Sequence, residues 1–100
     1  MVVATIRPLP EHREAVIAAL EKAIAAVHAD DEGCLLYALH EVDDRLVFIE
    51  KWASQEALDA HSRGPALAGL GPALAGKTVG SSDVQVLRPH PAGTASQGVL

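Results

Sequence analysis

A chain of 100 residues is long enough for one small domain, and a hydrophobic core of that size is only marginally stable by itself. Apolar residues make up 49% of the chain, which excludes an intrinsically disordered protein, and the single cysteine excludes an internal disulfide and a multi-cysteine metal site. The net charge of −5, without any basic cluster, argues against nucleic acid as a partner.

The N-terminal residues do not have the pattern of a secretory signal, because no basic region precedes an apolar stretch there. No apolar run in the chain approaches the roughly 20 residues that cross a bilayer as a helix. We therefore expect a cytoplasmic protein that has no membrane partner.

The first elements predicted along the chain are a strand and a long amphipathic helix. Residues 2–7 are rich in β-branched side chains and predict a strand that Pro8 closes. Pro10 suits the first turn of a helix, because the N–H that it lacks would have no partner there. From Pro10 to Ala29 apolar residues recur at steps of three and four, which predicts one buried helix face formed by Ile17, Leu20, Ile24 and Val27.

A turn at residues 30–33 follows the helix, and Gly33 can supply the positive φ that a helix end often needs. Residues 34–41 predict a second strand that is largely apolar on both faces. Alternation assigns these side chains to two sets: Cys34, Leu36 and Ala38 on one face, and Leu35, Tyr37 and Leu39 on the other. Such a strand belongs in a sheet that is covered on both sides. In so short a chain, the second cover could be another copy of the protein.

A short hairpin turn at residues 42–45 leads into an apolar strand at 46–52, which ends in the only tryptophan. Ser54 has the side-chain oxygen of a helix N-cap, and it precedes a predicted helix at 55–62. Strand geometry places Glu50 and Trp52 on one face, and helical spacing places Leu58 and His61 on one face. These residues are the strongest candidates for a functional site.

Residues 64–77 contain a near-duplication, GPALAGL followed by GPALAGK. Their alanine and leucine content predicts a short third helix at 65–75, which the glycines and Pro72 weaken. The spacing GxxxxGK at 71–77 is that of a phosphate-binding loop, but a nucleotide site is not expected because the segment neither follows a strand nor precedes a helix. A last strand is predicted at 81–88.

The predicted order of elements is β-α-β-β-α-(α)-β. This order is typical of an α+β, ferredoxin-like fold with an antiparallel sheet. We expect the domain to comprise residues 1–89. The remaining residues, 90–100, are rich in Pro, Gly, Ser and Thr without periodicity, and we expect them to form a flexible tail.

Two groups of residues resemble the antibiotic biosynthesis monooxygenase family of dimeric α+β barrels, and the likeness covers residues 2–89. The motifs are Gly33-Cys34-Leu35 with Tyr37 two residues further on, and Glu50-Lys51-Trp52 followed by Ala57-Leu58 and His61. The resemblance implies a homodimer in which two sheets pack face to face. It also implies a monooxygenase that oxidises a quinol or polycyclic phenol with dioxygen and without a cofactor. Its partners would be a small hydrophobic aromatic substrate and a second copy of the chain.

Two residues carry the expected chemistry. His61 is expected to be the catalytic group that accepts or orients a substrate hydroxyl proton; the alternative is a partly exposed histidine that bonds a local carbonyl. Trp52 is expected to form an aromatic wall of the substrate site, and the alternative is an ordinary core position. The five histidines are too widely spread to propose a metal site. His28 is expected to interact with the last carbonyls of the first helix.

Four further residues are expected to bind the substrate. Glu50 lies on a buried strand and must be paired, protonated or solvated; we favour an ion pair with an arginine such as Arg88. Tyr37 could donate its hydroxyl to a quinol or could reach the dimer interface. Leu58 and His40 complete the expected pocket, although an edge position suits His40 better.

Two other functions remain open from the sequence. A dimer of the same fold could bind a small ligand without catalysis. A haem-binding or haem-degrading protein is the other alternative, because haem degraders of this fold also have a tryptophan followed by a helix histidine. They use an asparagine on the first strand, however, and residues 2–7 contain none.

Overall fold

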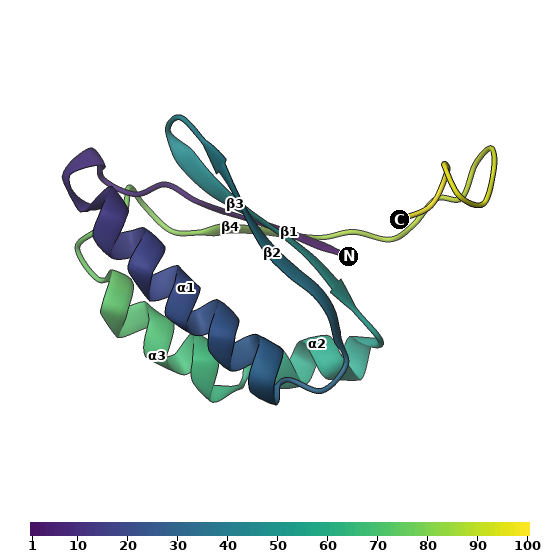
Figure 1. Cartoon of the computed structure of the whole chain (residues 1–100), viewed down its shortest axis with the longest axis horizontal. Helices are drawn as coiled ribbons and strands as arrows, with labels where there is room; N and C mark the ends of the chain where they lie inside the picture. The colour runs from purple at the N-terminus through teal and green to yellow at the C-terminus, as the bar shows by residue number, and fades with distance from the viewer.

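Three helices lie on one side of a four-stranded antiparallel sheet, and the computed structural model describes all residues from 1 to 100 (Figure 1). The strands are β1 (Val2–Ile6), β2 (Cys34–Val42), β3 (Arg45–Trp52) and β4 (Asp83–Val86). The helices are α1 (Arg13–Asp30), α2 (Gln55–Ser62) and α3 (Pro65–Leu74), with a short 3-10 turn at Pro10–His12 before α1. The sheet order β2-β3-β1-β4 confirms the predicted ferredoxin-like topology.

The core lies between α1 and the sheet face that α1 covers. Along β1, Val2, Ala4 and Ile6 are buried, whereas the alternate residues are only half-buried. Ala4 pairs with Phe48 and Ile6 with Leu46, so the same face of β3 is buried as well. These side chains form one cluster with residues of α1, which supplies most of the domain's apolar burial.

The buried stripe of α1 differs slightly from the predicted one. Its buried residues are Val16, Leu20, Ala23 and Val27. Ile17 and Ile24, which were expected to face the core, are only partly buried and pack at its margin. Leu20 and Val27 are buried as predicted. The other two predicted positions are each displaced by one residue, to Val16 and Ala23, and Ala23 lies in a groove with small residues of α3.

A β-bulge near the start of β2 changes which side chains share a face. Cys34 pairs with Trp52, whereas Leu36 pairs with Lys51, so β2 has one residue more than β3 between these pairs. Cys34 therefore lies on the same face as Trp52 and packs against the core cluster. The prediction that Cys34 shares a face with Leu36 is wrong, because strict alternation fails at a bulge.

Local sequence signals account for the helix ends. The Ser54 hydroxyl accepts a hydrogen bond from the Ala57 backbone N–H at 3.1 Å, which confirms the predicted N-cap of α2. Helix α3 begins at Pro65 and contains Pro72, and it ends one residue before the predicted boundary. None of the helices has both the length and the apolarity needed to cross a membrane.

The turn between α1 and β2 is packed tightly against α2. Gly33 adopts a φ of +82°, and a Cβ atom added to it would lie 2.7 Å from Cβ of Ala57. The Gly33 carbonyl also accepts a hydrogen bond from the backbone N–H of Ala53, at 2.8 Å. Glycine is needed here for its conformation and for its lack of a side chain.

Replacement of Gly33 by alanine should therefore destabilise the fold for two reasons. The positive φ alone costs an L-residue about 1–2 kcal/mol, and the contact with Ala57 adds to this. Gly76→Ala is the matched control, because Gly76 has a φ of +73° and no atom within 4 Å of an added Cβ. Urea unfolding should show a larger loss for Gly33→Ala than for Gly76→Ala. Equal losses would show that the turn has room to move away from α2.

Candidate functional site

A cavity of about 460 Å³ lies between the sheet and helices α2 and α3. Most of its lining is apolar, and the strands contribute one wall while the two helices contribute the other. The apolar residues include Val2, Ala4, Ile6, Phe48, Leu58, Leu67, Leu70, Leu74, Val84 and Val86. The polar residues are Tyr37, Glu50, Gln55, Asp59, His61, Ser62 and Ser82. A small number of polar groups in an apolar cavity is typical of a binding site for a small organic molecule.

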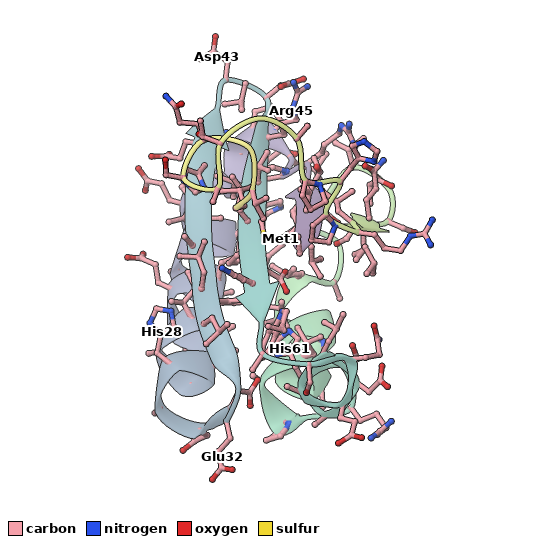
Figure 2. The ribbon with its side chains drawn as sticks, turned by 90° about the vertical axis from the view of Figure 1, so that its right-hand side faces the viewer. Met1, His28, Glu32, Asp43, Arg45 and His61 are labelled. Carbon is pink, nitrogen blue, oxygen red and sulfur yellow. The ribbon has the colours of Figure 1, made fainter.

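His61 is the only buried residue of α2, and just 4% of it is exposed. Figure 2 shows it on the side of α2 that faces the sheet. Its Nδ1 atom lies 2.7 Å from Oδ2 of Asp31, the residue that caps the C-terminal end of α1. Its Nε2 atom has no partner in the chain. Because no fully buried side-chain nitrogen or oxygen lacks a partner, Nε2 is not fully buried, and His61 is one of the residues that line the cavity.

Two aromatic rings hold the imidazole of His61 in place. The Trp52 ring lies at a centroid distance of 4.5 Å and is tilted by 32° to the imidazole. The Tyr37 ring lies 5.2 Å away in an edge-to-face arrangement. These contacts fix the plane of the imidazole, so His61 is a rigid part of the cavity wall.

Glu50 is also buried, and its partner is Trp52 rather than an arginine. The Trp52 Nε1–H donates a hydrogen bond to Oε1 of Glu50 at 3.0 Å, which is possible because the two residues share a strand face. The expected ion pair with Arg88 is absent, since β4 ends at Val86 and Arg88 lies beyond it. Burial raises the pKa of the Glu50 carboxyl, although the Trp52 bond and the nearby His61 oppose this.

Tyr37 provides a hydroxyl group that has no partner within the chain. The residue is 4% exposed and lines the cavity, and its ring packs on Phe48 at 4.6 Å. Burial raises the pKa of Tyr37, and the negative charges of Glu50 and Asp31 raise it further. The hydroxyl therefore stays protonated and can donate a hydrogen bond to a ligand.

The structure brings four of the six expected site residues to the cavity: His61, Tyr37, Glu50 and Leu58. Trp52 does not line the cavity but packs behind His61. His40 is exposed on the opposite face of the sheet, where it pairs with Val47. Its side chain follows the alternation of β2 beyond the bulge, which takes it away from Tyr37.

Two other expectations about polar side chains change with the structure, and one site residue was missed. His61 is buried and bonds a carboxylate, so the alternative of a partly exposed residue bonding a local carbonyl is wrong. His28 does not bond its own helix; its Nε2 lies 3.1 Å from the carbonyl oxygen of Tyr37 on β2. Asp31 was not foreseen as part of the site, because it is 30 residues from His61 in the sequence. No group of three or more His, Cys, Asp or Glu side chains is placed to hold a metal ion.

The raised pKa of Glu50 predicts a pH-dependent stability. The folded state holds the proton more tightly than the unfolded state, so the free energy of unfolding should fall as pH rises from the ordinary value of 4.5 through the raised pKa. The fall should be about 1.4 kcal/mol for each unit of pKa difference. Glu50→Gln should remove this fall in urea unfolding measured from pH 4 to pH 8.

The exposed Glu56 on α2 offers a matched control, and Glu56→Gln should keep the pH dependence of the unaltered protein. Identical pH profiles for the unaltered protein and Glu50→Gln would contradict the assignment of a raised pKa to Glu50.

Comparison with known proteins identifies the family of this chain. The sequence profile of the family described as "Antibiotic biosynthesis monooxygenase" matches residues 1–69. "Putative monooxygenase Rv0793" of Mycobacterium tuberculosis is 39% identical over 66 residues, a stretch that makes up 64% of this chain and 64% of that protein. This sequence match therefore spans less than two thirds of the relative's length.

Solved structures extend the likeness over more of the chain. The structure of Rv0793 superposes with a TM-score of 0.83 at 28% identity, and the match covers 93% of this chain and 96% of that one. A "putative antibiotic biosynthesis monooxygenase" from Caulobacter crescentus CB15 gives a TM-score of 0.79 at 25% identity, covering 84% of this chain and 82% of that one. Since the family profile matches well over half of its residues, the chain belongs to the antibiotic biosynthesis monooxygenase family.

Proposed function

We propose that this protein is a cofactor-independent monooxygenase that oxidises a quinol or a polycyclic phenol with dioxygen. The observation that supports this most strongly is the state of His61. One of its ring nitrogens is held by Asp31, and the other is free at the surface of an apolar cavity. This arrangement is suited to accept a proton from a bound hydroxyl group.

The reaction needs little more from the protein than binding and deprotonation. When Nε2 of His61 takes the proton of a ring hydroxyl, the resulting phenolate can transfer an electron to dioxygen. A quinol with one free ring position then gives a hydroxyquinone and water: it loses four electrons, one oxygen atom enters the ring as a hydroxyl, and the other leaves as water. Because the substrate supplies all four electrons, the balance closes without a further reductant.

The remaining cavity residues favour a flat hydroxylated ring system. The volume of about 460 Å³ is within the usual range for small-molecule sites, and its mostly apolar walls suit an aromatic ring. Its β4 side is open to solvent, because Val84 and Val86 are each 59% exposed. The free hydroxyl of Tyr37 can donate a hydrogen bond to a second oxygen of the substrate. Trp52 supports the site from behind by fixing the imidazole of His61.

Replacement of His61 by alanine should lower turnover about 10²-fold, because a positioned base contributes at least that much. Oxygen uptake with a quinol measures the rate, and thermal melts measure stability on the same samples. His28→Ala is the matched control, since His28 also bonds a neighbouring element but lies outside the cavity. Full activity of His61→Ala would show that His61 is not the catalytic base. If the unaltered protein oxidises no quinol or phenol, a non-catalytic ligand-binding role replaces the proposal.

We also propose that the protein is a homodimer in which two sheets meet. All three helices lie on one side of the sheet, and nothing in the chain covers the other side of its central strands (Figure 1). The register of the strands places five apolar side chains on that open face, Val3, Leu36, Ala38, Val47 and Ile49, together with the polar residues Thr5, His40 and Lys51. Burial of this surface against a second copy would add the core area that a 100-residue chain lacks.

Light scattering after gel filtration should therefore give the mass of a dimer at micromolar concentration. Ile49→Lys should give a monomer, because Ile49 pairs with Val3 and Ala38 in the middle of the open face. Glu56→Lys, on the exposed side of α2, should leave the dimer intact. A folded monomer of the unaltered protein at this concentration would contradict the proposal.

A further inference from the structure

We infer that Asp31 is the positioning residue of the site: its carboxylate holds the imidazole of His61 as the Nδ1–H tautomer and so keeps the lone pair of Nε2 directed at the cavity. The effect of Asp31 on turnover rests on the proposed monooxygenase function. The tautomer of His61 does not, and it can be measured in the absence of any substrate.

The hydrogen-bond chemistry of the pair determines the tautomer. An ionised carboxylate can only accept, so the Nδ1 atom that lies 2.7 Å from Oδ2 of Asp31 must carry the hydrogen. In the neutral ring, Nε2 is then left without a hydrogen and can act as a base. His28 has the opposite arrangement, because its Nε2 faces the carbonyl oxygen of Tyr37 at 3.1 Å and must be the donor. The chain thus contains two fixed histidines with opposite tautomers.

Asp31 supplies a hydrogen-bond acceptor for Nδ1–H of His61, which the aromatic neighbours of His61 do not. Tyr37 and Trp52 pack against the imidazole and restrict its plane. Neither ring supplies an acceptor for a ring N–H at Nδ1, and the only hydrogen bond that His61 makes through its side chain is the one to Asp31. This bond therefore selects which edge of the imidazole faces the cavity. Without it, a ring flip or a change of tautomer would present a C–H or an N–H where the base is needed.

The backbone around Asp31 is fixed on both sides, which makes the carboxylate a rigid partner. The Asp31 N–H donates to the carbonyl of Val27 at 3.0 Å, and the Asp31 carbonyl accepts from the N–H of Cys34 at 3.3 Å. Two residues beyond Asp31, Gly33 is bonded to Ala53 and packed against α2, the helix that carries His61. The end of α1 is therefore connected to α2 through the Gly33 turn as well as through the Asp31–His61 bond.

Asp31 does not line the cavity, so it acts on the substrate only through His61. When Nε2 accepts the substrate proton, the ring becomes positively charged. The Asp31 carboxylate beside Nδ1 stabilises that charge by accepting the Nδ1–H hydrogen bond.

The direct test is long-range ¹H–¹⁵N NMR of the protein labelled with ¹⁵N-histidine, without substrate. In the unaltered protein His61 should show the Nδ1–H pattern and His28 the Nε2–H pattern, so the second residue is an internal reference. Asp31→Asn should abolish the single Nδ1–H pattern of His61, because an amide can donate as well as accept. Glu32→Gln is the matched control: Glu32 is exposed in the same turn and points away from the molecule (Figure 2).

Kinetics then test the consequence of the tautomer. Asp31→Asn should lower kcat with a quinol about 10²-fold with little change in KM, whereas Glu32→Gln should change neither. An Nε2–H pattern of His61 in the unaltered protein would overturn the inference even if Asp31→Asn cannot be purified. The inference would also fail if Asp31→Asn kept the single Nδ1–H pattern of His61, or if it kept the kcat of the unaltered protein. If the unaltered protein oxidises no quinol, the proposed function fails, while the NMR result still decides whether Asp31 sets the tautomer.

Discussion

The short hydrogen bond between Asp31 and His61 adds a polar link between two parts of the chain that Gly33 already packs together. It connects the C-terminal end of α1 to α2 at the edge of the core, where the apolar packing of α1 against the sheet gives way to the cavity. Buried polar groups are tolerated only when they are paired, and here the pairing is complete enough that no enclosed polar side-chain atom lacks a partner. What remains unpaired, Nε2 of His61 and the hydroxyl of Tyr37, is at the cavity and is available to a ligand.

The cavity exists because α3 is made of small residues. The near-duplicated GPALAGL and GPALAGK segments place leucines toward the sheet but leave glycines between them. Gly71 lines the cavity and would meet no atom within 4 Å if it carried a Cβ. With aromatic residues at only 3% of the chain, no large side chain fills the space between α3 and β4. The repeat therefore has a structural consequence, which is an unfilled apolar space beside the polar cluster.

Much of the fold follows from patterns that are local in the sequence. The β-branched run of β1, the periodicity of α1 and the cap at Ser54 each involve residues within one or two turns of each other, and the structure confirms the elements that they predict. The bulge in β2 could not be predicted, because an extra residue in one strand is recognised only from its pairing with the next. This extra residue places the Cys34 side chain on the same face of the sheet as Trp52.

The site was less predictable than the fold for the same reason. Glu50, Tyr37 and His61 could be found because their strands and helix were predicted correctly. Asp31 could not, because it comes to His61 only through tertiary packing, such as that of Gly33 against α2. The partner of Glu50 is two residues away on the same strand, but a carboxylate accepting from an indole N–H has no sequence signature that separates it from an ion pair.

The proposed function requires that His61 contacts the hydroxyl group of a phenolic ligand inside this cavity. A crystal structure with a phenol that dioxygen cannot oxidise tests this directly. We expect the ring to lie between the sheet and α3, with its hydroxyl oxygen within about 2.6–3.2 Å of Nε2 of His61. A phenol bound elsewhere, or bound in the cavity with its hydroxyl directed away from His61, would contradict it.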